Sequence, residues 1–379
     1  MRKHLSLFLC TVMIFSLLSI VSYADDTGYV VTKSELEEQN EIDAALLAEA
    51  EAGYTFDDPL VVVNPYGTTP LSAVIIFDTE EETGVTVNAK GHNEKDDITA
   101  VFQAETRHIL PILGLYAGGE TEIELTLDDG TVTTLTVETD PLPESEVKAE
   151  VVTLDDSVYD YSKLTFAYRV EACDAYDSEG DLRYYCTNPA FPLLSFENGH
   201  LGCFVPGMNA QLTFNGVIEQ DIVGRIYNQY ELPSGVHHEV MELPNGNIMI
   251  ASSHDDMSVI NCRVIEIDRT SGEIVWDLDM CDLLEHPEHP GEGQLQNWMH
   301  NNGLWYDEAT DSLFMSCRHI SSIICIDKST QEIKWILGDR EGYTDKTDNS
   351  LFFTPVDDGS EFEWQYVQHN VSLLPDEDG

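Results

Sequence analysis

The chain has 379 residues, and its 18 Lys and Arg stand against 70 Asp and Glu, for a formal net charge of −52 at pH 7. A surface this acidic repels nucleic acid and anionic membranes, so we predict no partner of either kind. An anionic ligand could bind only where the scarce basic side chains gather, which makes their placement informative.

The N-terminus reads as a secretory signal peptide over residues 1–24. A basic start is followed by an apolar run over residues 5–21 and by small residues ending at Ala24, where cleavage is expected. An uncleaved membrane anchor is the alternative. No other segment approaches the ~20 apolar residues of a membrane span. We therefore expect an exported protein, located in the periplasm or outside the cell, including the cell surface.

Seven of the eight cysteines lie beyond the signal peptide. Export permits disulfides and leaves at least one thiol over. Cys317 and Cys325 flank a tight turn, and Cys173 and Cys186 flank a Gly-Asp loop, but the pairing stays open. No Cys-x-x-Cys or Cys/His spacing predicts a zinc site.

Residues 25–54 form an acidic segment that predicts one helix. The helix is expected over residues 34–51, with Ser34 as N-cap, Glu37 completing a capping box and Gly53 ending it.

Residues 55–143 predict an Ig-like β-sandwich, because turn signals recur between short apolar strands. His92 and His108 are expected to be ordinary surface residues. The expected strands are 60–63, 73–77, 84–87, 121–127 and 131–137, the last two joined by an Asp-Gly hairpin turn.

An internal repeat indicates a β-propeller over residues 150–379. An Ile-Asp turn ending at Asp268 is followed by Trp276, and the same pattern recurs at Asp327 and Trp335, 59 residues later (327 − 268). A unit of four strands at this period is typical of propeller blades. A sandwich with chance similarity is the alternative. The predicted fold class is therefore all-β, with a sandwich followed by a propeller.

A predicted hairpin brings a histidine and an arginine together. Strands over 304–306 and 312–317 flank a turn cluster at 307–311, so His300 and Arg318 should lie at the same end of the sheet. A neutral imidazole beside a guanidinium suits chemistry on an oxyanion ester. The alternative is that both side chains bond loop carbonyls.

Histidines recur where the repeat begins its inner strand. His238, His300 and His369 occupy this place, and His237 aligns as well as His238. Inner strands of a propeller line one channel, so the rings should converge there. The mouth of this channel would also hold Asn302, Arg318 and His319. Three histidines can bind a metal, but Arg318 would repel a cation, so we predict none.

The combination of motifs resembles the bacterial aryl sulfotransferase family, exported arylsulfate sulfotransferases that use no phosphoadenosine cofactor. The resemblance covers nearly the whole mature chain and implies an N-terminal β-sandwich and a six-bladed propeller. The matching motifs are Gly235-Val236-His237-His238-Glu239, Trp298-Met299-His300-Asn301-Asn302, Ser316-Cys317-Arg318-His319 and Val367-Gln368-His369-Asn370.

The resemblance implies transfer of a sulfuryl group from a phenolic sulfate ester to a phenol by a ping-pong route through a sulfated histidine. It implies no cofactor, an aryl sulfate donor and a phenolic acceptor, and it leaves a homodimer open. The implied roles are His369 as nucleophile, His300 and Arg318 as stabilisers of the transferring group, His237 or His238 as acid/base, and Asn302 and His319 as substrate contacts.

The residues agree with this chemistry. An imidazole of pKa near ~6.5 is largely neutral at pH 7 and can attack without prior activation. A sulfuryl group, like a phosphoryl group, is expected to pass through a loose, in-line transition state whose oxygens need fixed donors. The sequence has neither the Cys-x-Pro-x-Arg motif of formylglycine sulfatases nor a phosphate-binding loop.

The chain departs from the family pattern in one respect. The sequence ends at Gly379, within the hairpin expected after His369. Residues 150–379 have room for four or five blades of this repeat, so the propeller is expected to be incomplete. A second hypothesis is a non-catalytic exported propeller that binds a ligand. A binding module has no need for a histidine facing Arg318, which distinguishes the two.

Overall fold

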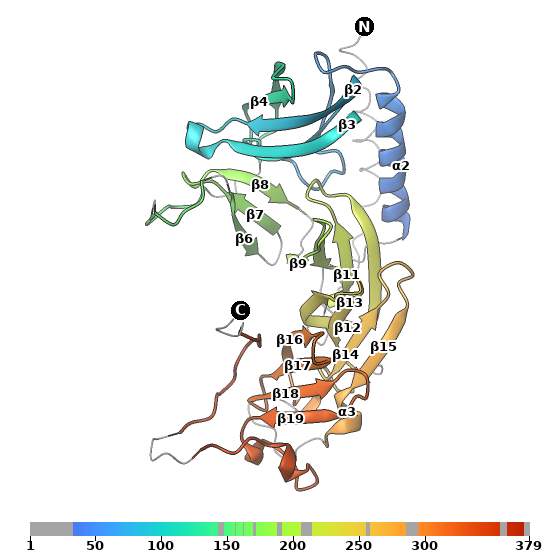
Figure 1. Cartoon of the computed structure of the whole chain (residues 1–379), viewed down its shortest axis with the longest axis vertical. Helices are drawn as coiled ribbons and strands as arrows, with labels where there is room; N and C mark the ends of the chain where they lie inside the picture. Colours follow the sequence, from blue (N-terminus) through green and yellow to red (C-terminus); the bar gives the residue numbers. More distant parts are fainter. Residues whose placement is uncertain are drawn as a thin grey trace.

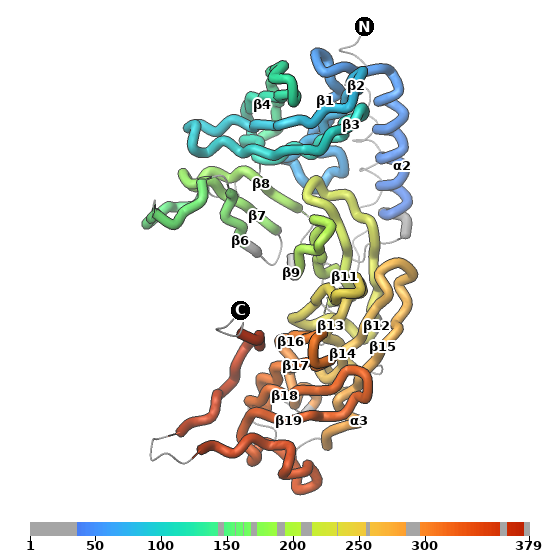
Figure 2. Tube along the Cα trace, viewed as in Figure 1, coloured from blue at the N-terminus to red at the C-terminus, as the bar shows by residue number. Residues whose placement is uncertain are grey.

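The computed structural model describes residues 33–142, 148–155, 157–161, 163–169, 172–187, 192–205, 214–254, 258–285, 295–356 and 362–374. The predicted signal peptide lies outside these residues. The described chain is nearly all β and forms an elongated crescent, with the N-terminal sheet at one end and strands β16–β19 at the other (Figures 1 and 2). The predicted all-β fold class with an Ig-like N-terminal domain is confirmed.

Helix α2 (Lys33–Ala50) lies along one side of the N-terminal sheet (Figure 1). It begins one residue before Ser34, so the predicted N-cap at that residue is wrong: Ser34 is part of the first turn. Gln39 fixes the helix to the following part of the chain, because its side chain accepts the N–H of Ile226 at 2.5 Å and donates to the Gly224 carbonyl at 3.4 Å. Among the described residues, no helix is long and apolar enough to cross a membrane.

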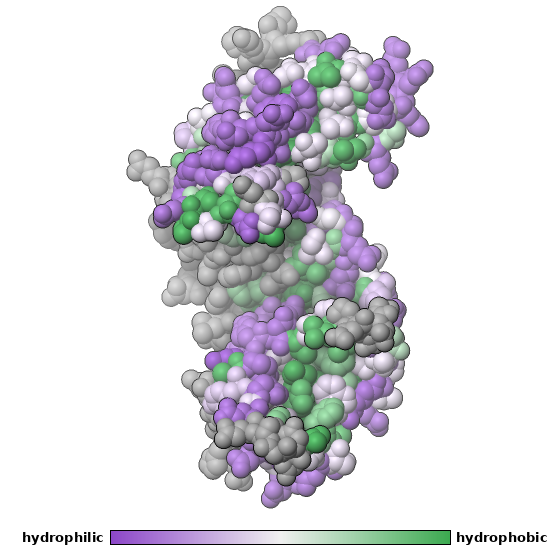
Figure 3. All heavy atoms as spheres, turned by 60° about the vertical axis from the view of Figure 1, so that its left-hand side comes forward, coloured by the Kyte–Doolittle hydropathy of each residue, from purple (hydrophilic) through white to green (hydrophobic). Residues whose placement is uncertain are grey.

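The N-terminal sheet has five strands in the order β1-β2-β4-β5, with β3 paired to β2. Apolar side chains such as Ile75, Ile123 and Leu125 fill its core. Figure 3 shows hydrophilic side chains over much of the sandwich face, and in the lower half a band of apolar side chains flanked by hydrophilic ones. The strands are β1 (Leu60–Val63), β2 (Ala73–Ala89), β3 (Ile98–Ile112), β4 (Glu120–Leu127) and β5 (Val132–Glu138).

Two predictions for this sheet are wrong. The expected strands 73–77 and 84–87 are one strand, because register shifts against β3 accommodate the exposed acidic run between Asp78 and Thr83 and pairing continues beyond it. His108 is buried rather than on the surface, since it lies on β3 with its ring stacked on Phe77 at 4.6 Å.

A buried arginine joins the sandwich to the next sheet, which consists of β6 (Thr165–Arg169), β7 (Ala172–Tyr176) and β8 (Leu182–Cys186). Arg183 is fully buried and donates to the Gly114 carbonyl at 2.7 Å and to Asp177 Oδ2 at 3.1 Å. Its desolvation is compensated by these bonds, so the two sheets are fixed relative to each other at this point.

The central sheet has seven strands in the order β15-β14-β13-β12-β11-β10-β9. Strand β12 is shared between two units: Tyr230 pairs with Val217 of β11, whereas Val240 pairs with Ile250 of β13. The ladder shifts register between Val236 and Val240. The strands are β9 (Pro192–Ser195), β10 (Leu201–Phe204), β11 (Phe214–Gln220), β12 (Ile226–Glu242), β13 (Ile248–Ser252), β14 (Arg263–Ile267) and β15 (Ile274–Asp279).

The last sheet is a four-stranded unit in the order β16-β17-β18-β19. The sequence repeat is a structural repeat, since Trp276 pairs with Glu266 and Trp335 pairs with Cys325, with a register shift at the same place in both ladders. The central sheet, in which two units share β12, and the separate four-stranded sheet are together consistent with an incomplete propeller. The strands are β16 (Asn301–Asp307), β17 (Ser312–Cys317), β18 (Ser322–Asp327) and β19 (Ile333–Leu337).

Short helical turns complete the described elements: α3 (Met280–Leu283), η1 (Glu94–Asp96), η2 (Leu295–Asn297), η3 (Arg340–Gly342) and η4 (Asn349–Leu351). Residues 362–374 form no regular strand and return toward β16 (Figure 1). Gln365 holds this return, because its amide donates to the carbonyls of Leu337 at 2.6 Å and Ser321 at 3.3 Å.

Candidate active site

Two neighbouring strands bring histidines together. His237 and His238 lie at the bend of β12, and His300 directly precedes β16. His238 and His300 both have positive φ, at 59° and 51°. This left-handed conformation is uncommon for residues other than Gly, although His adopts it more often than most, and it persists where the surrounding structure holds it. The backbone therefore directs both rings to one point.

The imidazoles form one contiguous cluster. The Nε2 atoms of His238 and His300 are 3.1 Å apart, which is a hydrogen bond between two rings. The His237 ring centroid lies 3.9 Å from that of His238 and 4.8 Å from that of His300. His369, from the returning segment, places its ring 4.7 Å from His238. Residues far apart in the sequence thus share one site.

Asn297 orients two of these rings. Its side-chain Nδ2 is 3.0 Å from His300 Nδ1, its Oδ1 accepts from Asn261 Nδ2 at 3.2 Å, and its carbonyl accepts from His319 Nδ1 at 2.5 Å. As an amide N–H donates to Nδ1, the proton of a neutral His300 lies on Nε2, facing His238. Asn297 was missed in the sequence, because it lies in the short turn η2, outside the repeat pattern.

Arg318 lies at the same end of the sheet as His300, as the hairpin predicts. Its backbone N–H donates to the His300 carbonyl at 3.0 Å, and Asn301 pairs with Cys317 in the ladder. Its guanidinium is close enough to lower the pKa of His238 and His300 by charge. His319 follows it, with its ring centroid 4.4 Å from that of His300.

The segment that carries His369 is held by side-chain amides. Asn302 donates from Nδ2 to the Gln368 carbonyl at 2.9 Å. Gln368 donates from Nε2 to the carbonyls of Cys317 at 3.2 Å and Ser322 at 2.9 Å. Asn302 therefore contacts the residue next to His369, and its predicted contact with substrate stays a prediction.

A glycine permits this close approach. A Cβ atom on Gly303 would lie 2.9 Å from the Cα atom of Asn370 and 2.8 Å from its Oδ1. Any other side chain at this position of β16 would push the segment with His369 away from the sheet. The glycine thus sets how near His369 comes to the other histidines.

Burial keeps the sheet-borne histidines neutral. Burial first, and then the charges of neighbouring histidines, lower the pKa of His237 to about 3, of His238 to about 4 and of His300 to about 2. Burial raises the pKa of Glu239, next to His238, to about 7. At neutral pH these imidazoles can act as bases or hydrogen-bond partners without first losing a proton.

The spacing of three histidines is also compatible with a metal. Ring nitrogens of His237, His238 and His300 lie within 4.8 Å of one another. Three imidazoles form known zinc sites, but the positive charge of Arg318 acts on the same rings and opposes a cation.

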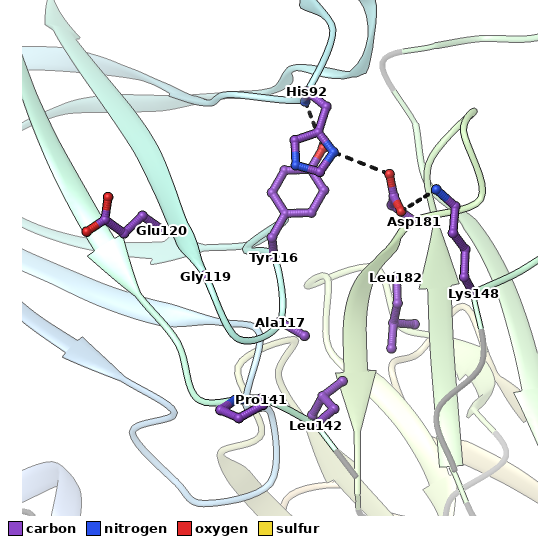
Figure 4. A pocket seen from close by; sticks show the side chains of 10 residues that line it. All are labelled: His92, Tyr116, Ala117, Gly119, Glu120, Pro141, Leu142, Lys148, Asp181 and Leu182. Carbon is purple, nitrogen blue, oxygen red and sulfur yellow. Dashed lines mark hydrogen bonds and ion pairs between the residues drawn. The ribbon is translucent and has the colours of Figure 1, made fainter. Parts of the chain in front are cut away.

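A separate hollow lies at the junction of the sandwich and the β6–β8 sheet, and none of the predicted site residues lines it (Figure 4). There the His92 ring stacks on the Tyr116 ring with their centroids 3.9 Å apart. The Asp181 carboxylate lies 3.4 Å from His92 Nδ1 and forms an ion pair with Lys148 Nζ at 2.7 Å. Because His92 and Lys148 are both paired with Asp181, and none of the predicted site residues is present, we assign the hollow no catalytic role.

Comparison with known proteins identifies the class. The family model described as arylsulfotransferase (ASST) matches residues 144–379, and that of the arylsulfotransferase Ig-like domain matches residues 60–141. The first match alone covers more than half of the chain. The chain therefore belongs to the arylsulfotransferase family and is an arylsulfate sulfotransferase, a transferase. The alternative of a non-catalytic binding module is set aside.

Two relatives named as arylsulfate sulfotransferases are similar to most of the chain. The arylsulfate sulfotransferase AssT of Escherichia coli O6:H1 is 23% identical over 428 residues, covering 82% of this chain and 71% of that protein. AssT of Lelliottia amnigena is 23% identical over 430 residues, covering 83% and 71%. The hydrazine synthase of Kuenenia stuttgartiensis is a weak structural neighbour, with a TM-score of 0.33 and 12% identity over 71% of this chain and 76% of its own.

Proposed function

We propose that this enzyme transfers a sulfuryl group from an aryl sulfate to a phenol by a ping-pong mechanism, with His369 as the sulfated nucleophile. The observation that carries the proposal is the contact of His369 with His238, and through it with His300, beside Arg318. A nucleophile, neutral imidazoles and a fixed cation are the groups that transfer of an anionic ester group requires.

In the first half-reaction a ring nitrogen of His369 attacks sulfur, an N–S bond forms and the S–O bond to the aryl group breaks. The phenolate leaves with the electron pair of that bond. In the second half-reaction the oxygen of the acceptor phenol attacks sulfur and the N–S bond breaks. The acceptor proton passes to a base, and His369 is regenerated as a neutral imidazole.

His300 and Arg318 would stabilise the oxygens of the transferring group. His300 is suited to this role because Asn297 holds its Nδ1 and leaves the Nε2 proton directed into the cluster. Such fixed donors are worth ~2.7–4 kcal/mol each where charge develops.

His238 or His237 would act as acid and base for the two phenols. The lowered pKa values keep both rings neutral at pH 7, which is the form that can accept the proton of the acceptor phenol. A bound sulfate ester would raise these pKa values again, because its negative charge favours the imidazolium. Proton donation to a departing phenolate therefore becomes available when the donor is bound.

Dependence on an acceptor tests the ping-pong route. Phenol release from a chromogenic aryl sulfate is measured with and without a second phenol. The sulfo-enzyme should accumulate without acceptor, so adding the second phenol should raise steady-state release. Equal rates with and without acceptor would indicate a hydrolase and contradict the proposal.

We also propose that the enzyme is exported. The proposal rests on the basic start, the apolar run and the small residues before Asp25, which together have the pattern of a signal peptide. N-terminal sequencing of the chain from the extracytoplasmic fraction tests it, with a start at Asp25 expected. A chain found with Met1 in the cytoplasm would contradict it.

A further inference from the structure

A second cluster of potential metal ligands lies where β14 begins and its partner strand β15 ends. Donor atoms of Cys262, Asp279 and Cys281 lie within 4.8 Å of one another. The Cys262 Sγ is 3.8 Å from Asp279 Oδ1, and His254 Nε2 is 3.7 Å from Asp279 Oδ2. Sequence spacing gave no sign of this cluster, since its members come from three different segments.

The local fold fixes these side chains in place. Strands β14 and β15 are antiparallel and Arg263 pairs with Asp279, so Cys262 and Cys281 lie just past the end of one ladder. Asp279 caps α3 by accepting the N–H of Cys281 at 2.9 Å, and Met280 donates its N–H to the Cys262 carbonyl at 2.9 Å. Both thiols are therefore directed to one carboxylate.

The chemistry of the four groups fits a soft divalent cation. Zinc binds Cys sulfur at about 2.3 Å and His nitrogen or carboxylate oxygen at about 2.0–2.2 Å, so ligand atoms on a tetrahedron lie about 3.3–3.8 Å apart. The separations of 3.8 and 3.7 Å to Asp279 are close to these edges. Binding of the cation would offset the negative charge that two thiolates and one carboxylate bring to one place as ligands.

We propose that Cys262, Cys281 and Asp279 bind a structural zinc ion, with His254, which lies beside Asp279, as the fourth ligand. The site is distinct from the histidine cluster but connected to it. Asn261, next to Cys262, donates to Asn297 Oδ1 at 3.2 Å, and its carbonyl accepts the N–H of Asn301 at 3.0 Å. Zinc would thus brace the turn that holds the residue orienting His300.

Metal content of the purified full-length chain tests this proposal. After incubation with zinc sulfate and removal of excess metal, elemental mass spectrometry should find about one zinc ion per chain. Cys262→Ser and Cys281→Ser should each lose it, whereas the buried thiol of Cys325, on β18, provides a matched control, and Cys325→Ser should keep it. A wild-type chain without zinc would overturn the proposal.

A second measurement on the unmutated chain covers the case in which a variant fails to fold. Cys262 and Cys281 should resist iodoacetamide in the zinc-loaded chain and react after a chelator is added, as read by peptide mass spectrometry. Two linked peptides lighter by two hydrogens would show a disulfide instead and overturn the proposal. Zinc that survives Cys281→Ser but is lost in His300→Gln would place the ion at the histidines and overturn it too.

Discussion

His300 and His369 come from two differently built halves of the site. His300 precedes a strand of the four-stranded unit, has hydrogen-bond partners at both ring nitrogens and is partly buried. His369 is exposed and belongs to a segment without regular strand, held to the sheet by the side chains of Gln365, Gln368 and Asn302.

This difference matches the roles proposed for the two residues, stabilisation of the transferring group by His300 and nucleophilic attack by His369. Groups that stabilise a transition state act best when they are fixed in advance, because they then need no reorganisation during the reaction. A nucleophile that receives a group from one substrate and gives it to another needs access from solvent. The sheet supplies the fixed half, and the returning segment supplies the accessible one.

The largest effect is expected for His369→Asn. Loss of the nucleophile removes the covalent route, and His300 cannot replace it because its Nδ1 lone pair accepts the Asn297 amide and its Nε2 carries the proton of the neutral ring. Transfer should fall to background, and no acid-labile sulfate should be trapped on the protein from a labelled donor.

The control for that variant is His92→Asn, which changes an exposed histidine on the sandwich far from the cluster. It should transfer sulfate at the wild-type rate. Substantial transfer by His369→Asn, or labelled sulfate recovered on His300, would contradict the assignment of the nucleophile.

Arg318→Leu should have the next largest effect. It leaves His369 in place and removes positive charge beside His238 and His300, so the loss should appear mainly in kcat, on the order of 10²–10³-fold. Arg318→Lys keeps the charge without the planar fork and should lose less. Steady-state kinetics with a chromogenic aryl sulfate measure both, and equal losses in the two variants would argue against an electrostatic role.

The two halves also differ in how far the sequence predicted them. The repeat predicted the outer strands that contain Trp276 and Trp335, although both strands continue past the tryptophan, to Asp279 and Leu337. The hairpin predicted that His300 and Arg318 share one end of a sheet. Both follow from local periodicity and turn residues, which act over a few positions.

Contacts between distant segments were harder to predict. Strand β3 was missed because its exposed residues interrupt the apolar alternation, and His108 was placed on the surface although it stacks on Phe77. The orienting role of Asn297 and the approach of Cys262 to Cys281 depend on tertiary packing, which no spacing in the sequence records.

The smallest effect is expected for Gln368→Ala, which loosens the attachment of the segment that carries His369 to the sheet. The Gln368 side chain donates to the carbonyls of Cys317 and Ser322, and each such bond contributes about 0.5–1.5 kcal/mol. Asn302 still holds the Gln368 carbonyl in this variant, so His369 should stay near the cluster but sample other positions. We expect about a tenfold lower rate of sulfo-enzyme formation in a single turnover, which corresponds to about 1.4 kcal/mol.

Gln365→Ala is the matched comparison, because Gln365 also donates to two backbone carbonyls, those of Leu337 and Ser321, but lies four residues before His369. The two variants remove similar bonds from one segment and should lower the thermal unfolding temperature by similar amounts. If the bonds next to the nucleophile position it, only Gln368→Ala should slow sulfation markedly. Equal slowing by both variants would mean that general loosening of the segment, rather than the local position of His369, limits the reaction.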